Sequence, residues 1–214
     1  MEWIVPAAQR GETPNVYTTP KMVQPIELVI LHYTASGTLQ SAERWFMSPT
    51  SGASAHFLVD VDGTVRQLAP LSVRTWHAGG PSSSWRGGPV NRRSIGIEIV
   101  NWGLLERRGA QLYTWTGKLY QGESYETDEG IWAVFPEVQR DAVVELLAQL
   151  VQLYPVLAQR DARPGEQERI CGHCDVDPSR KKDPGGAFLL PDVRGMALLK
   201  SLSPGADTAC ADTP

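Results

Sequence analysis

The sequence predicts an α/β protein in which helices flank a mixed central β-sheet. Two apolar runs rich in β-branched residues, at 26–34 and 94–102, have the length and composition of buried strands. A long amphipathic pattern at 136–154 predicts a helix. Because strands and helices alternate without a regular βαβ repeat, we expect a mixed sheet. A chain of 214 residues, 42% of them hydrophobic, can bury one sizeable core, so one domain is expected.

The first third of the chain is predicted to be an arm, a strand and a hairpin. Residues 1–25 are rich in Pro, Thr and Gln and show no periodicity, so we expect an irregular arm laid over the domain. The buried strand 26–34 follows. Residues 56–70 form two alternating runs around Asp62-Gly63, a pair that suits a tight hairpin turn. Residues 74–93 are predicted to be loop.

Three segments are predicted to be helical. Residues 38–47 have helical spacing, and Thr38 or Ser41 could cap the start. The apolar face of this helix would contain Leu39, Ala42, Trp45 and Phe46. The helix at 136–154 begins at a proline, which is favoured at the first helical position. Its core-facing side chains would be Val138, Ala142, Val144, Leu146, Leu147, Leu150 and Val151. A C-terminal helix is expected around 190–202.

The second half of the chain holds an unusual segment. Residues 103–135 are rich in Tyr, Trp and Gly and are predicted to be an aromatic-rich insert, built as a β-hairpin or lid. A last short strand is expected at 168–174. The catalytic domain would then span 26–202, and 203–214 would be a disordered tail.

Composition excludes several classes of protein. The net charge is −4 and no basic block is present, so a nucleic-acid partner has little support. No apolar stretch approaches the roughly 18 residues of a membrane span. The N-terminus lacks a basic region followed by an apolar run, so no Sec signal peptide is expected. We expect synthesis in the cytoplasm and, if the protein is exported, another route.

The three cysteines do not predict a disulfide framework, because their number is odd. Cys171 and Cys174 form a C-x-x-C pair that could be redox-active or bind a metal. No second cysteine pair follows, which excludes a four-cysteine zinc site within the chain.

All four histidines lie at predicted strand ends or in loops, where functional sites are often assembled. A catalytic zinc ion needs three protein ligands and one open position. His32, His173 and Asp183 could supply a His₂-carboxylate set. Spacing alone leaves the alternative that each histidine is a partly buried, hydrogen-bonded side chain.

Five segments resemble one known family. The chain is similar to the zinc-dependent N-acetylmuramoyl-L-alanine amidases, which include phage amidase lysozymes, bacterial recycling amidases and animal peptidoglycan recognition proteins. In order along the chain, the matching segments are VILHYTA (29–35), SAHFLVDVDGTVRQL (54–68), TWHAGG (75–80), RSIGIEIVN (93–101) and GHCDVDPSRKKDPGGAF (172–188). Together they extend over about three quarters of the chain.

The resemblance implies the type 2 amidase fold and assigns a zinc ion to His32, His173 and Asp183. Its K-x-D-P-G pattern places the functional lysine at Lys181, where a cation would stabilise the oxyanion that develops on the amide carbonyl. Lys182 is expected to be a solvated loop charge. The two C-x-x-C cysteines fall outside the ligand positions.

Glu98 is a carboxylate in an otherwise apolar strand, which is costly unless it is paired or faces a polar cleft. One alternative is an ion pair with a buried arginine. The resemblance instead implies that Glu98 is the general base, as in the recycling branch. Other branches use a tyrosine before the "HF" histidine, where this chain has Ala55.

The resemblance also suggests substrate contacts. His77, in the loop that lines the family's cleft, is expected to touch sugar or peptide, together with Trp76, Thr34 and Asn101. His56 is expected to be structural. Three tryptophans near or within the insert could serve as glycan contacts or as core: Trp102, Trp115 and Trp132.

The expected function is hydrolysis of the amide between N-acetylmuramic acid and L-alanine of the peptidoglycan stem peptide by a zinc enzyme. The sequence does not determine the oligomeric state, and a monomer is favoured. The aromatic insert favours an endolysin-like lytic enzyme that acts on the cell wall after release. Three alternatives stay open: a cytosolic amidase that recycles anhydro-muropeptides, a non-catalytic peptidoglycan-binding module, and a zinc hydrolase for another amide.

Overall fold

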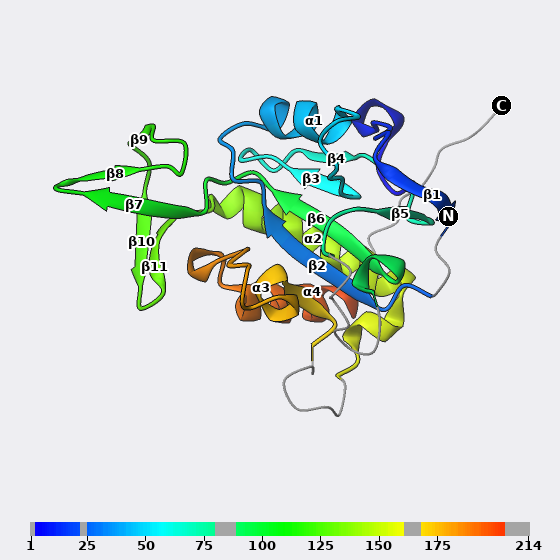
Figure 1. Cartoon of the computed structure of the whole chain (residues 1–214). Coiled ribbons are helices and arrows are strands. Elements are labelled where there is room, and N and C mark those ends of the chain that lie inside the picture. The colour runs from blue at the N-terminus through cyan, green and yellow to red at the C-terminus, as the bar shows by residue number, and fades with distance from the viewer. Residues whose placement is uncertain (1–2, 22–24, 80–88, 161–167, 204–214) are drawn as a thin grey trace.

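A five-stranded sheet forms the centre of the computed structural model, which describes residues 3–21, 25–79, 89–160 and 168–203 (Figure 1). The strand order is β12-β2-β6-β3-β4. The strands are β2 (Leu28–Tyr33), β3 (Phe57–Val59), β4 (Val65–Gln67), β6 (Ser94–Ile99) and β12 (Ile170–Gly172). Neighbouring strands are parallel except for the β3–β4 hairpin. The mixed sheet that the sequence predicts is therefore confirmed.

Helices cover both faces of this sheet. The helices α2 (Glu137–Leu153) and α4 (Leu190–Ser201) pack on one face, and α1 (Leu39–Met47) lies on the other, over β3 and β4 (Figure 1). Strand β6 shows the alternation clearly. Ile95, Ile97 and Ile99 belong to the same core cluster as the apolar face of α2. Ser94, Gly96 and Glu98 therefore point to the opposite face.

Two helical side chains differ from expectation. Trp45 of α1 is 57% exposed and Val138 of α2 is 52% exposed, whereas the sequence predicts that both face the core. Only Ala42 and Phe46 of α1 are buried, because positions four residues apart share the stripe that meets the sheet. Val138 lies in the first turn of α2 and contacts Gly63 of the β3–β4 turn, at the edge of the core. The cap of α1 is Thr38, whose side chain accepts a hydrogen bond from the amide of Ser41.

The N-terminal arm contains regular structure that the sequence does not predict. A 3₁₀ helix, η1 (Ala7–Gln9), is followed by β1 (Val16–Lys21), which pairs antiparallel with β5 (Val73–Thr75). The guanidinium carbon of Arg74 lies 4.0 Å from the centre of the Tyr17 ring, a cation–π contact between the two strands. The sequence pattern does not predict this β1–β5 ribbon, because β5 lies in a segment that is predicted to be loop.

Residues 104–133 form a second sheet rather than a single hairpin. Its order is β10-β11-β7-β8-β9, and it extends to one side of the molecule (Figure 1). The strands are β7 (Leu104–Arg108), β8 (Gln111–Tyr113), β9 (Leu119–Tyr120), β10 (Ser124–Thr127) and β11 (Gly130–Ala133). All neighbours pair antiparallel. The two ends of the segment meet, since the amide of Ala133 donates to the carbonyl of Gly103 over 2.9 Å.

Short helical turns complete the chain. They are η3 (Val90–Arg92), η4 (Pro155–Ala158), α3 (His173–Val176) and η5 (Gly186–Phe188). None of the described helices has the length and apolarity that a membrane crossing requires. Most of the predicted loop 81–93 and of the predicted tail 203–214 lies outside the described residues.

Candidate metal centre

Three candidate site residues lie side by side across the sheet because of strand register. His32 of β2 pairs with Glu98 of β6, and Leu31 of β2 pairs with Gly172 of β12. His173, which begins α3, directly follows Gly172. Since these strands are parallel, His173, His32 and Glu98 are adjacent at the same edge.

Asp183 reaches this edge from a tight turn. Asp175 caps the backbone amide of Gly172, and Asp177 accepts hydrogen bonds from Ser179 and Arg180. The carbonyl of Asp183 accepts a hydrogen bond of 3.0 Å from the amide of Cys174. The turn therefore carries the Asp183 side chain back toward α3.

The three expected ligands meet in one buried cluster. His32 Nδ1 lies 2.8 Å from Asp183 Oδ2, and His173 Nδ1 lies 3.1 Å from the same oxygen. One donor atom from each residue can be chosen so that all three lie within 4.8 Å of one another. Two imidazole nitrogens and a carboxylate oxygen that converge in this way suit a zinc ion.

The protonation states of the cluster also suit a metal. Burial lowers the pKa of His32 to about 4, although Asp183 opposes this shift. Burial alone would raise the pKa of Asp183, but its hydrogen bonds with His173 and His32 hold that pKa below the ordinary range. A neutral imidazole and an ionised carboxylate are the forms that bind a metal.

Glu98 is buried beside the cluster. Burial, and then the negative charge of Asp183, raise the pKa of Glu98 well above its ordinary value, while the charge of Lys181 lowers it. The buried arginine that precedes this strand, Arg93, pairs with Glu27 instead, at 3.1 Å. Within the described residues, the alternative of an ion pair between Glu98 and a buried arginine is not found.

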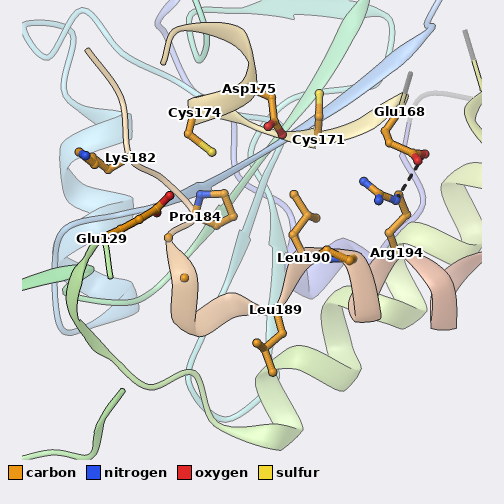
Figure 2. A pocket seen from close by; sticks show the side chains of 13 residues that line it. Glu129, Glu168, Cys171, Cys174, Asp175, Lys182, Pro184, Leu189, Leu190 and Arg194 are labelled. Atoms are coloured by element: carbon orange, nitrogen blue, oxygen red, sulfur yellow. Dashed lines mark ion pairs between the residues drawn. The ribbon is translucent and has the colours of Figure 1, made fainter. Parts of the chain in front are cut away.

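The two lysines before Asp183 differ in their surroundings. Lys181 is half-buried, and its charge acts on both Glu98 and His32. Lys182 is exposed and lines a separate pocket of about 610 Å³ (Figure 2). In Figure 2, Lys182 and Glu129 lie at one end of this pocket, and the ion pair between Glu168 and Arg194 lies at the other.

The C-x-x-C cysteines line the same pocket (Figure 2). Cys171 is buried and Cys174 is half-buried. Burial, followed by the charge of Asp175, raises the pKa of Cys174 to about 12. A thiol that stays protonated is a poor nucleophile and a poor metal ligand, which disfavours both roles for Cys174.

Two further histidines are buried near the cluster. The Nδ1 of His77 lies 3.2 Å from Nε2 of His32, and only 9% of His77 is exposed. His77 is thus buried against His32. A residue that contacts the substrate would instead be expected in an open cleft. His56 is fully buried: it accepts from the amide of Gly96 over 3.0 Å, and its Nε2 lies 2.8 Å from the carbonyl of Val73.

The other expected substrate contacts have mixed surroundings. Asn101 is buried, and its side chain bonds to the carbonyl of Val134 and the amide of Gly103. Its amide group is therefore engaged in joining β6 to the second sheet. Trp76 is half-buried and packs edge-on against Tyr17, with ring centres 5.9 Å apart.

A groove of about 570 Å³ begins where β2 ends, and Thr34 lines it. Trp45 and Trp115, 57% and 69% exposed, also line it, as does Arg44. The indole of Trp115 donates to the carbonyl of Ala35 over 2.7 Å, so the second sheet reaches the body here. We call this the Trp45–Trp115 groove. Trp132, by contrast, is 1% exposed and belongs to the core.

The fold and the site together define an α/β protein with a buried His-His-Asp cluster that could hold a metal ion, beside a further carboxylate. A family model described as N-acetylmuramoyl-L-alanine amidase matches residues 22–186. The chain belongs to this family.

Curated relatives include two kinds of amidase. A 1,6-anhydro-N-acetylmuramyl-L-alanine amidase, AmpD, of Salmonella typhimurium is 32% identical over 149 residues, covering 69% of this chain and 59% of the relative. The N-acetylmuramoyl-L-alanine amidase AmiD of Escherichia coli is 28% identical over 171 residues, covering 76% and 50%. The chain thus spans between 50% and 59% of the length of these relatives.

Solved structures show the same fold. An AmpD crystal structure superposes with a TM-score of 0.60 at 22% identity, covering 91% of this chain and 96% of that one. The E. coli AmiD complex with anhydro-N-acetylmuramic acid-L-Ala-D-gamma-Glu-L-Lys gives a TM-score of 0.58 at 25% identity, covering 84% and 61%. The expected type 2 amidase fold is therefore confirmed.

Proposed function

We propose that this protein is a zinc amidase that hydrolyses the amide bond between N-acetylmuramic acid and L-alanine in muropeptides. The observation that carries the proposal is the convergence of His32, His173 and Asp183 beside the buried carboxylate of Glu98. Family membership supports the same chemistry.

The three ligands would hold zinc, which when bound acts as a Lewis acid on water and on the scissile carbonyl. Glu98 takes a proton from the attacking water and later delivers it to the leaving amine. Its raised pKa suits both halves of this exchange, because a group that accepts and then donates works best near the operating pH. Lys181 places a positive charge where the carbonyl oxygen becomes negative.

Two variants test the roles of base and ligand. Glu98→Ala is expected to retain stoichiometric zinc and to lose about 10²–10⁴-fold in turnover, because only the proton acceptor is removed. His173→Ala is expected to lose both zinc and turnover. Metal content and the release of L-alanine-terminated peptide from a purified muropeptide are measured on both. Full turnover in Glu98→Ala would show that the base lies elsewhere.

The substrate is proposed to be a soluble anhydro-muropeptide. The AmpD relatives carry that substrate in their name, and the AmiD structure holds such a molecule. These comparisons support recycling chemistry more than the lytic role that the aromatic segment suggests. Parallel assays on intact sacculi and on a purified anhydro-muropeptide compare the two substrates. Faster release from sacculi would favour the lytic role.

The assay also separates an enzyme from a binding module. A non-catalytic binder would release no peptide from either substrate, with or without added zinc. All three ligands are present in this chain, which favours the enzyme.

A further inference from the structure

A chain of hydrogen bonds ends on the ligand His32. His32 Nε2 lies 3.2 Å from His77 Nδ1, and His77 Nε2 lies 3.0 Å from the hydroxyl of Ser94. That hydroxyl lies 2.7 Å from the backbone carbonyl of Val90. His32, His77 and Ser94 are all buried, so solvent competes little for these bonds.

The positions of the hydrogens follow from the last member of the chain. The carbonyl of Val90 can only accept, so Ser94 must donate its single hydroxyl hydrogen to it. The oxygen of Ser94 then accepts from His77, which places a hydrogen on His77 Nε2. Among the described residues, the side chains that His77 faces are two other imidazoles and a hydroxyl, with no carboxylate in contact, so the buried ring is neutral and has one ring hydrogen. His77 Nδ1 is therefore an acceptor, and His32 must donate from Nε2.

We propose that His77 and Ser94 are positioning residues that hold the ring hydrogen of His32 on Nε2, so that the lone pair of Nδ1 faces the metal position. This rests on the proposed function only in taking His32 as a metal ligand. It also replaces the expectation that His77 touches the substrate.

The opposite tautomer would hinder metal binding. His32 Nδ1 lies 2.8 Å from the carboxylate of Asp183. Without an acceptor at Nε2, the hydrogen would move to Nδ1 and form a charge-assisted bond to that carboxylate. The metal would then have to displace this hydrogen. Partners of this kind orient metal-bound imidazoles and set their basicity.

This chain of hydrogen bonds ends on only one of the two histidines expected to bind the metal. In the part of the molecule that the structure describes, Nε2 of His173 is buried and has no hydrogen-bond partner. His32 is thus the ligand that is fixed before metal arrives, and it lies on the central strand β2.

The sequence of β6 makes room for this arrangement. A Cβ atom at Gly96 would lie 2.4 Å from Cγ of His77, so a side chain there would displace the ring. Ser94, Gly96 and Glu98 share one face of the strand. The same strand face therefore supplies the hydroxyl anchor, the space for His77 and the proposed base.

Three variants and one control test the proposal. His77→Leu removes the acceptor, Ser94→Ala removes the anchor, and His77→Asn keeps an acceptor oxygen near the position of Nδ1. His56→Asn is the control, because His56 is also a buried histidine but lies outside the chain of hydrogen bonds. The zinc dissociation constant is measured by competition with a chromophoric chelator. The tautomer of His32 is measured from ring ¹⁵N chemical shifts of the metal-free protein.

The Leu and Ala variants are expected to bind zinc about 10–100-fold more weakly and to carry the His32 hydrogen on Nδ1. His77→Asn and His56→Asn are expected to stay near the wild-type affinity. At saturating zinc, KM of His77→Asn should equal that of the wild type, whereas a substrate contact would raise it.

The result that overturns the proposal is wild-type zinc affinity in Ser94→Ala or His77→Leu, or a wild-type His32 that carries its hydrogen on Nδ1. If the wild type binds no zinc, the metal function itself fails. The ¹⁵N tautomer of metal-free His32 still decides the role of His77 in that case, so the two failures are distinguishable. Should His77→Leu not fold, the milder Ser94→Ala gives the same decision.

Discussion

Lys181 and Lys182 are neighbours in the chain, yet their surroundings differ. The charge of Lys181 lowers the pKa of both Glu98 and His32, while Lys182 is exposed beside a different pocket. The family's K-x-D-P-G pattern makes the same distinction between the two lysines. The amides of Arg180 and Lys181 both donate to the carbonyl of Asp177, so the turn fixes the backbone up to Lys181.

The pH profile provides a test of this pair. Glu98 must be ionised to accept a proton, so kcat/KM rises with pH through its pKa. Lys181→Met removes a charge that lowers this pKa, so the acidic limb is expected to move to higher pH and kcat to fall about 10²-fold or more. Lys182→Met, the matched control, is expected to leave both unchanged. Equal shifts in the two variants would contradict the assignment.

The sequence predicts residue identities better than it predicts residue contacts. His32, His173 and Asp183 are expected from motif positions, and the structure brings them together. The contacts of His77 could not be predicted, because its partners His32 and Ser94 are 45 and 17 positions away. The sequence shows a serine and a glycine, Ser94 and Gly96, on the polar face of an apolar strand. These two residues indicate the position of His77 only once the fold is known.

Among the elements, β6 has one face in the core and the other face at the site. His56 forms hydrogen bonds to β6 and to a neighbouring strand. One imidazole links the residue just before β3 to the backbone of β5 and of β6. Burial lowers the pKa of His56 to about 4, from an ordinary value of 6.5. A protonated ring could no longer accept from the amide of Gly96.

This gives a stability prediction with a defined sign. Because the folded-state pKa of His56 lies below its unfolded value, the unfolded chain binds more protons between pH 6.5 and pH 4. The contribution of His56 is thus fully present above pH 6.5 and is lost as pH falls toward 4, by about 2 kcal/mol at pH 5. Urea unfolding of the metal-free wild type and of His56→Asn, at pH 7.5 and 5, measures it. The difference between the two proteins should shrink at pH 5, and a constant difference would refute it.

Element positions are predicted well where the pattern is local. The strands β2 and β6, the β3–β4 hairpin and the three long helices lie where periodicity places them. The β1–β5 ribbon escapes prediction, because its stability depends on a distant partner rather than on its own pattern. The prediction that Trp45 faces the core is wrong for a related reason. An apolar side chain at the edge of a helix can line a groove as well as a core.

For the whole molecule, the main feature is a second sheet set beside the first. The aromatic composition of 103–135 predicts β-structure, but five strands cannot be distinguished from one hairpin, since short strands lack a clear pattern. Two tryptophans of this sheet contact the body. Trp132 is buried against Gly185 in the ligand loop, and Trp115 borders the Trp45–Trp115 groove.

Trp115 offers a test of what the second sheet contributes. Trp115→Ala is expected to raise KM for a muropeptide several-fold and to leave zinc content unchanged, because an exposed ring that borders a groove contributes binding but holds no ligand. Trp115→Phe keeps an aromatic face but loses the bond to Ala35, so it should lie between Ala and the wild type. A KM unaffected in both variants would place the substrate outside the groove.

The hydrogen bond between Ala133 and Gly103 has a consequence for engineering. The second sheet leaves and rejoins the body at two adjacent backbone positions, so its removal would leave a gap that a short turn could close. The metal ligands and the proposed base are anchored on β2, β6 and the segment after β12, none of which belongs to that sheet. A designer could exchange the outer part of the segment for the corresponding loop of another amidase, provided that Trp132, which belongs to the core and packs against Gly185 in the ligand loop, is kept.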